Sequence, residues 1–176
     1  MSRLGQFFRR FGEDRDGLAA IEMSLVGVFL SAALINAVEI GRYGMALMQV
    51  DNAAQAGAAA ANHTCDIEHL PATTNCSALY SSVTTAVQST SLGDHVYVQG
   101  TISEGWYCIN SAKALEYVAP VGSKPADCTS VHNDTGSPGL YLAVHATYLY
   151  QPIFPGLTIA ETFQGNINRT AWMRLL

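Results

Sequence analysis

The chain has 176 residues, of which 49% are hydrophobic, and its 9 basic and 14 acidic side chains give a formal net charge of −5. This length allows one small globular domain in addition to an anchoring helix. The acidic balance and the lack of a basic stripe argue against a nucleic-acid-binding protein.

Residues 1–17 are polar and hold four arginines against three acidic residues. Residues 18–176 hold the other five basic residues and eleven acidic ones. The positive-inside rule places an arginine-bearing leader in the cytoplasm and the C-terminal body across the membrane. We therefore expect residues 1–17 to be a cytoplasmic leader peptide that is not part of the mature fold.

An apolar run extends from Leu18 to Val38, and Glu22 is the only ionisable residue among its 21 positions. As a helix, the run would be about 30 Å long, which matches the hydrocarbon core of a bilayer. A carboxylate at the centre of a membrane costs about 2.5–3.5 kcal/mol, and such a residue is by default a functional candidate. Cleavage between Gly17 and Leu18 would create an α-amino group one helical turn before Glu22. The two charges could then neutralise each other, within one chain or between packed helices.

The motif Gly17-Leu18-Ala19-Ala20-Ile21-Glu22 resembles the class III signal of type IV pilins, which has Gly before the cleavage site and Glu at the fifth mature position. Residues 12–61 more specifically resemble the TadE-like minor pilins (pseudopilins) of tight-adherence (Tad/Flp) pili, whose helix ends in an Ala/Gly-rich segment, as at residues 52–58. The resemblance implies four partners: a prepilin peptidase, other pilins, an inner-membrane assembly platform and membrane lipid. It also implies a role in pilus assembly (initiation, priming or tip) and not in catalysis.

Other interpretations of this run remain open. An ordinary signal anchor would have to tolerate the cost of Glu22 near the membrane interface. A cleaved secretory signal peptide has a shorter apolar region than this one. A type II secretion pseudopilin would share the signal, whereas the Ala/Gly-rich helix end favours the TadE-like group.

The helix should continue past the membrane to about Ala61, because residues 39–61 lack proline and are rich in Ala, Met and Leu. A helix over residues 18–61 would be about 66 Å long. Glu39 and Arg42 are three residues apart, so they can pair on one helical face. The small residues at 53–59 allow close approach to another helix or to a sheet, within this domain or within a filament.

The cysteines all follow the apolar run: Cys65, Cys76, Cys108 and Cys128. An even number on the exported side indicates disulfides formed in an oxidising compartment such as the periplasm. Of the three possible pairings we expect the sequential one, because each bond would then close a local loop rich in turn residues. A zinc site at His63, Cys65, His69 and Cys76 is the weaker alternative, because the Cys-x2-Cys spacing is missing.

After a loop at residues 62–76, a second helix is expected from Ser77, as its N-cap, to about Thr90, with Leu79, Val83 and Val87 on one face. Alternation predicts a strand at residues 94–101, where Val96 and Val98 face away from Tyr97. A second short strand is expected at residues 106–109. Residues 113–118 are expected to form one or two helical turns.

Residues 120–139 are rich in Gly and Pro and are expected to form a long exposed loop tethered by Cys128. Clear alternation predicts a strand at residues 140–150 with both faces partly covered. A turn at Pro152 and Pro155-Gly156 should follow, and a half-solvated strand should then occupy residues 158–173.

These elements predict an α+β fold. A long N-terminal pilin-like helix, transmembrane over about residues 18–38, would pack on a small antiparallel sheet of three or four strands with an extra helix, and residues 62–176 would form the exported domain. We found no catalytic, phosphate-binding or metal-binding motif, so an enzyme, a cofactor and a metal are not expected. The expected location is the bacterial inner membrane in single-pass form and, after assembly, the pilus. The alternative function is a pilus-tip adhesin that binds through residues 120–139.

Overall fold

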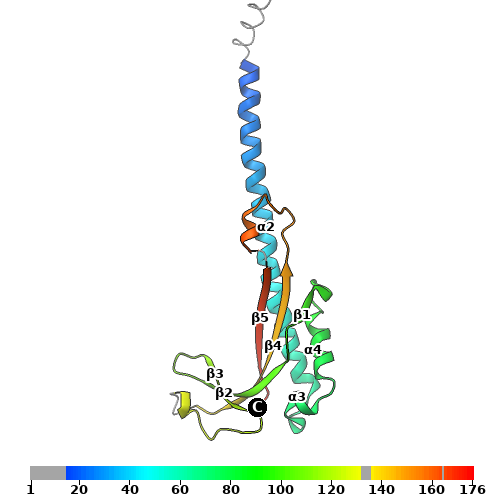
Figure 1. Cartoon of the computed structure of the whole chain (residues 1–176), viewed down its shortest axis with the longest axis vertical. Coiled ribbons are helices and arrows are strands. Elements are labelled where there is room, and N and C mark those ends of the chain that lie inside the picture. The colour runs from blue at the N-terminus through cyan, green and yellow to red at the C-terminus, as the bar shows by residue number, and fades with distance from the viewer. Residues whose placement is uncertain (1–14, 132–135, 164) are drawn as a thin grey trace, which may run out of the picture. The chain divides into compact units, whose positions relative to one another are not determined.

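The computed structural model describes residues 15–131, 136–163 and 165–176 (Figure 1). Most of the predicted leader therefore lies outside the described residues. Helix α2 (Arg15–Thr64) is a single α-helix of 50 residues and includes the whole apolar run. The predicted long N-terminal helix is present, and it extends three residues beyond the expected end at Ala61.

The chain divides into two compact units. One unit holds the chain up to Arg42 together with Pro152–Phe163, and the other holds Tyr43–Gln151 together with Gln164–Leu176. The second unit contains the sheet and the main hydrophobic core.

The second unit contains a five-stranded antiparallel sheet, not the three or four strands expected. Its strands are β1 (Val96–Val98), β2 (Ser103–Ile109), β3 (Leu115–Pro120), β4 (Gly139–Tyr150) and β5 (Gly165–Arg174). Strand β4 is central, since β1 pairs with it at residues 146–148 and β2 at residues 139–143, while β5 pairs along residues 141–150. Residues 141–143 pair with both β2 and β5, so those two strands lie on opposite edges of β4. Strand β3 continues the sheet beyond β2.

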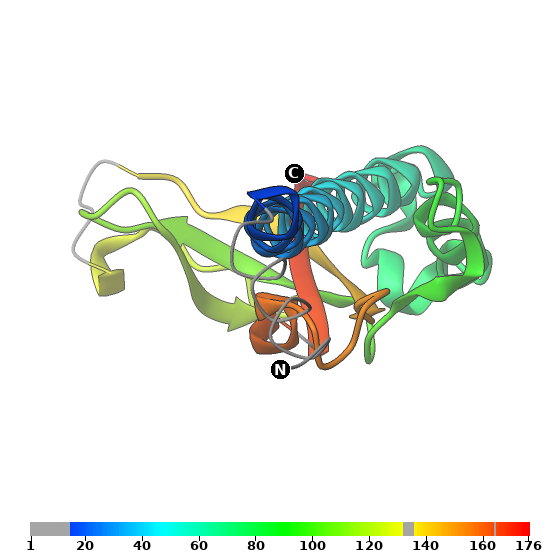
Figure 2. The same ribbon diagram turned by 90° about the horizontal axis from the view of Figure 1, so that it is seen from above.

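The C-terminal half of α2 packs on this sheet (Figures 1 and 2). Its buried positions recur every three or four residues, which is the spacing of one helical face. They are small except for one valine: Ala46, Val50, Ala53, Ala54, Gly57, Ala58 and Ala61. Strand β4 contributes Leu142, Val144 and Ala146 to the same core. The strand predicted at residues 140–150 is thus present with both faces partly covered, and the Ala/Gly-rich segment packs within this domain.

Helix α4 (Leu79–Val87) completes the core with Leu79, Val83 and Val87, all buried. These are the three residues that the sequence places on its apolar face. The cap prediction was wrong, because Ala78 is the N-cap residue and no side chain caps the helix. Strand β1 has the expected alternation, with Val96 and Val98 buried and Tyr97 exposed.

Residues 113–118 do not form helical turns. Leu115–Pro120 is strand β3, which pairs with β2. The connecting turn places Lys113 at φ 61°, and the Asn110 side-chain oxygen accepts hydrogen bonds from the backbone N–H groups of Ala112 and Ala114 at 3.0 Å. Asn side chains favour such turns by hydrogen-bonding to the backbone nearby. This turn chemistry selects the hairpin over a helix.

The last predicted strand is also shorter than expected. Residues 158–163 are not extended, and Ile159–Phe163 forms the 3-10 helix η4. Strand β5 begins only at Gly165, whose φ of 136° lies in a region that suits glycine. Within β5, Ile167 and Ala171 face the core, and the residues between them are exposed or partly buried, so the strand is half-solvated as predicted.

Most described residues between 120 and 139 are exposed and Cys128 tethers the stretch, as predicted, but parts of it are buried. Cys128 and Val131 are buried and form a small second core with Cys108. Val131 belongs to a short 3-10 helix, η3 (Thr129–Val131). Residues 132–135 of the stretch lie outside the described residues. The chain is therefore packed around its disulfide and is not a freely exposed loop throughout.

Candidate functional site

The predicted cleavage and charge-pairing residues lie together near the N-terminal end of α2. The bond between Gly17 and Leu18 is within the helix, and Glu22 follows one turn later. The side chain of Glu22 is exposed, and among the described residues it has no hydrogen-bond or ion-pair partner. The structure thus leaves this carboxylate accessible.

The apolar segment around Glu22 is exposed from residue 19 to residue 34. Met23 is 75% exposed and Phe29 76%, and none of the most apolar window of the helix is buried by the rest of the chain. By length and composition, α2 could cross a membrane. Large apolar side chains in continuous exposure require a lipid or protein environment.

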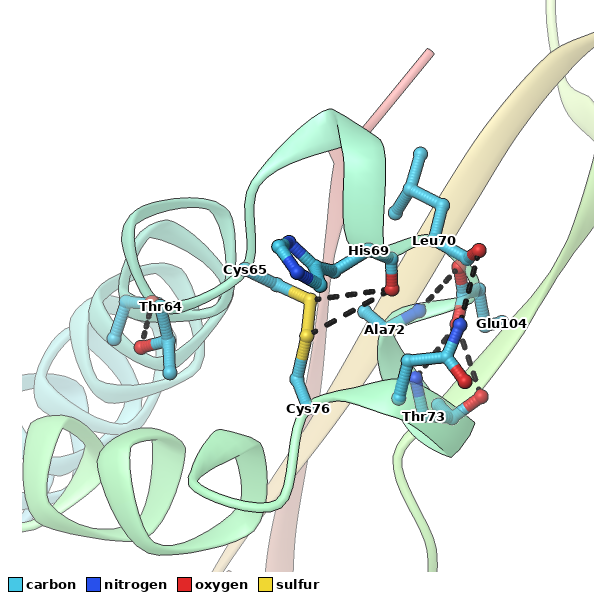
Figure 3. Close-up of a disulfide and its surroundings, with 10 residues drawn as sticks. Thr64, Cys65, His69, Leu70, Ala72, Thr73, Cys76 and Glu104 are labelled. Carbon is cyan, nitrogen blue, oxygen red and sulfur yellow. Dashed lines mark hydrogen bonds between the residues drawn. A yellow bond between two sulfur atoms is a disulfide. The ribbon is translucent and has the colours of Figure 1, made fainter.

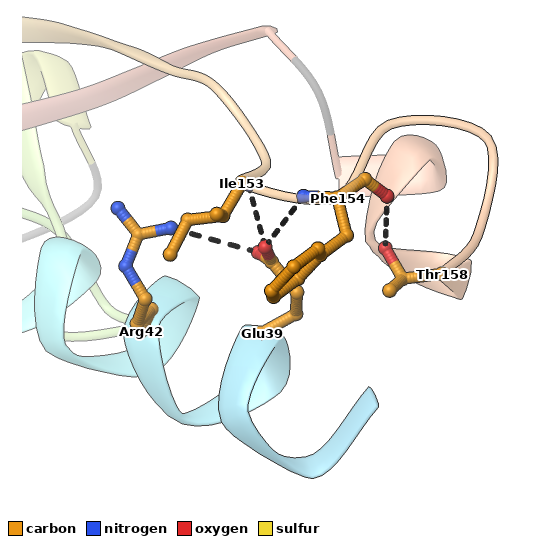
Figure 4. A network of polar contacts seen from close by, with 5 residues as sticks. All are labelled: Glu39, Arg42, Ile153, Phe154 and Thr158. Carbon is orange, nitrogen blue, oxygen red and sulfur yellow. Dashed lines mark hydrogen bonds and ion pairs between the residues drawn. The ribbon is translucent and has the colours of Figure 1, made fainter. Parts of the chain in front are cut away.

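The end of the apolar run carries a buried carboxylate. Glu39 is 0% exposed, and its Oε1 accepts hydrogen bonds from the backbone N–H of Ile153 at 2.5 Å and of Phe154 at 3.2 Å (Figure 4). The predicted pair with Arg42 is present, with 3.7 Å between Arg42 Nη1 and Glu39 Oε2. Two backbone donors and a guanidinium together compensate for the removal of this charge from water.

One turn earlier, Asn36 makes a second link to the same loop. Its side-chain oxygen accepts a hydrogen bond from the backbone N–H of Ile159 at 2.9 Å, and its amide nitrogen donates to the carbonyl of Ala32 at 2.8 Å. Residues 152–163 are thus held on α2 through Asn36 and Glu39. We refer to residues 152–163 as the juxtahelical loop.

A disulfide joins Cys65 to Cys76 just beyond the end of α2 (Figure 3). The loop between them contains η1 (Ile67–His69) and α3 (Ala72–Asn75). Glu104 of β2 fixes this loop, because its carboxylate accepts hydrogen bonds from the backbone N–H groups of Ala72 at 3.2 Å and Thr73 at 2.9 Å. Since both sulfurs are joined, they are not the thiolate ligands that the alternative zinc site would need.

The second disulfide joins Cys108 of β2 to Cys128, so the structure has the sequential pairing. Next to it, Asp127 accepts hydrogen bonds from the hydroxyl of Thr129 at 2.7 Å and from its backbone N–H at 3.1 Å. These hydrogen bonds favour the charged form and lower the pKa of the Asp127 carboxyl. The carboxylate is exposed, and these hydrogen bonds to a residue two positions away form a local turn.

An aromatic cluster lies on the sheet around Tyr107. Its ring makes edge-to-face contacts with Trp172 at 4.9 Å, Tyr117 at 5.5 Å and Tyr141 at 6.1 Å between centroids. Partial burial, and to a smaller extent the neighbouring Tyr117, raises the pKa of Tyr107. Tyr117 and Trp172 remain 54% and 41% exposed. The alternation of β2 and β5 does not by itself predict that these rings meet.

Two functional features were missed at the level of sequence. The pairing of Glu39 with Arg42 was predicted from their spacing, but the burial of Glu39 was not, because its backbone partners lie 114 and 115 residues further along the chain. The anchoring role of Glu104 was missed for the same reason, since Ala72 and Thr73 are 32 and 31 residues away. A carboxylate directly after the apolar run was the one signal that could have drawn attention to Glu39.

Within the described part of the chain, no group of three or more His, Cys, Asp or Glu side chains could hold a metal ion. Comparison with known proteins identifies no relative: no family model, no curated protein and no solved structure matches the chain. Proposals about its function therefore rest on its own residues and geometry, together with the resemblance of residues 12–61 to TadE-like minor pilins.

Proposed function

We propose that this chain is a minor pilin of the TadE-like type, which is processed by a prepilin peptidase and takes part in the assembly of a Tad/Flp-type pilus. One observation carries the proposal. Glu22 is exposed and is the only ionisable residue in the apolar run, and it lies one helical turn after the Gly17–Leu18 bond. The resemblance to the class III signal of type IV pilins implies that this bond is cleaved and that Glu22 becomes the fifth residue of the mature chain.

The proposed mechanism is assembly through helix–helix contact. The run 18–38 holds the precursor in the inner membrane, with residues 1–17 in the cytoplasm and the domain in the periplasm. After cleavage, the amine of Leu18 and the carboxylate of Glu22 neutralise each other within one chain or between neighbouring subunits. Only a correctly aligned helix pairs both charges, so the interaction selects one register within an apolar filament core.

The rest of the chain supports a role in assembly and not in catalysis. Its C-terminal unit is a small disulfide-bonded domain docked on the same helix that carries Glu22. Such a domain can be exported while the helix remains in the membrane. Since major pilins of the family are much shorter chains, a subunit of this size suits initiation, priming or the tip of the pilus.

The direct test is to replace Glu22 with alanine. The variant should enter the membrane and be cleaved normally, because α2 stays apolar and Gly17 is unchanged, but it should not be incorporated into pili. Met23→Ala is the matched control, since it truncates an exposed neighbour without changing charge. Immunoblots of sheared pili and of membranes measure both outcomes. Normal incorporation of the Glu22→Ala chain would contradict the proposal.

A further inference from the structure

The juxtahelical loop exposes apolar side chains although it is firmly attached to α2. Leu157 is 70% exposed, Ile159 57% and Ile153 51%. The loop turns other residues inward, since Thr158 and Ala160 are buried. Its exposed apolar surface is thus a consequence of a defined conformation and not of a lack of structure.

The loop contains very little charge. Glu161 is the only ionisable residue among its twelve positions, and its carboxylate accepts a hydrogen bond from the backbone N–H of Gly156. The hydroxyls of Thr158 and Thr162 donate to backbone carbonyls of the loop, at 3.4 Å and 2.6 Å. Each of these polar groups has a hydrogen bond within the loop, which lowers the cost of placing the loop at the boundary of an apolar environment.

The hydrogen bonds to Asn36 and Glu39 hold the loop beside the end of the apolar run. Asn36 lies two residues before the end of the apolar run at Val38, and Glu39 directly follows it. If residues 18–38 span a bilayer, this is the level at which the helix enters the headgroup region. Glu39 can remain there because the loop supplies backbone N–H donors to its carboxylate.

We propose that the juxtahelical loop lies in the headgroup region of the bilayer and inserts Ile153, Leu157 and Ile159 toward the acyl chains. The occupant of this surface is lipid because the exposed apolar surface of the loop continues that of the membrane-spanning run, in which Val38 is 53% exposed. Amphipathic segments bind membranes in this way, with apolar side chains buried at the boundary between headgroups and acyl chains. The loop would fix how deeply α2 sits in the membrane. This inference rests on the membrane anchorage of the proposed function but not on pilus assembly.

The test is depth-dependent fluorescence quenching of the full chain in phosphatidylcholine vesicles. Tryptophan is introduced at Leu157 in the loop, and the emission of the parent chain, which contains Trp106 and Trp172, is subtracted. Phe29→Trp is the membrane control, because Phe29 is 76% exposed in the apolar run. Tyr80→Trp is the control for the domain, since Tyr80 is 56% exposed on α4. Lipids brominated near the headgroup or near the chain terminus act as quenchers.

We expect Leu157→Trp to be quenched most strongly by bromines near the headgroup, Phe29→Trp by bromines near the chain terminus, and Tyr80→Trp by neither. Quenching of Phe29→Trp without any quenching of Leu157→Trp would overturn the loop proposal and leave the anchor intact. A blue shift of Leu157→Trp without bromine quenching would show that protein covers the loop, which also overturns it. If Phe29→Trp is not quenched either, then the membrane anchorage fails, and the loop proposal fails with it.

Discussion

At the scale of single residues, Glu39 connects two segments that are far apart in sequence. A carboxylate taken out of water is costly unless donors and an opposite charge surround it. Here the backbone N–H groups of Ile153 and Phe154 and the guanidinium of Arg42 provide both. The conformation of the juxtahelical loop and the burial of Glu39 therefore depend on each other.

Truncation of Glu39 to alanine should release this loop. The two N–H groups would lose their acceptor, and each buried donor left unsatisfied costs about 1–3 kcal/mol. Amide hydrogen exchange at Ile153 and Phe154 should accelerate strongly in the full chain in detergent. Glu39→Gln is the control, because it keeps an oxygen acceptor while removing the charge, and its effect should be smaller. Unchanged exchange in Glu39→Ala would show that these hydrogen bonds do not hold the loop.

At the scale of elements, the contact between α2 and its domain depends on small residues. A Cβ added at Gly57 would lie 2.7 Å from Val87 Cγ2, 3.1 Å from Val144 Cγ1 and 3.3 Å from Val83 Cγ1. One glycine thus allows the helix to approach both α4 and β4. Helix propensity alone would favour alanine at this position.

Gly57→Ala should therefore destabilise the domain, because overpacking of a tight core costs about 1–3 kcal/mol. The gain in helix propensity offsets no more than about 1 kcal/mol of this. Gly44→Ala is the matched control in the same helix, where an added Cβ meets no atom within 4 Å, and it should be neutral or slightly stabilising. Denaturant unfolding of the full chain in detergent measures both. Equal effects of the two substitutions would contradict the packing described for Gly57.

Periodicity predicted the elements that bury one regular face. The buried positions of α4 and the alternation of β1 follow directly from residue spacing. The errors occurred where local turn chemistry or a distant partner decides the conformation. Asn110 closes the β2–β3 hairpin, and Asn36 accepts a hydrogen bond from Ile159 at the start of η4, although the sequence alternates there.

In the candidate site, too, the residues of a local motif could be predicted from sequence and the long-range contacts could not. Gly17, Leu18 and Glu22 lie within one short motif, so sequence alone could identify them. The link between Glu39 and the juxtahelical loop spans 114 residues, and no local pattern in either segment predicts it. Features that depend on such long-range contacts require the folded structure.

At the scale of the whole molecule, the chain combines an exposed apolar segment with a disulfide-bonded domain. The exposed segment is stable only in lipid or among other helices, whereas the domain has a core of its own. A subunit that moves from a membrane into a filament would have both properties. Processing at Gly17 separates such a subunit from an ordinary membrane anchor, because only cleavage creates the amine that can pair with Glu22.

The most direct measurement is the intact mass and N-terminal sequence of the protein purified from membranes, with and without the prepilin peptidase. We expect a mature chain that begins at Leu18 only when the peptidase is present. Gly17→Leu is the control, because an added Cβ at Gly17 meets no atom within 4 Å, and this chain should stay unprocessed in both strains. A wild-type chain that keeps residues 1–17 in both strains would contradict the account and would leave an ordinary membrane-anchored protein.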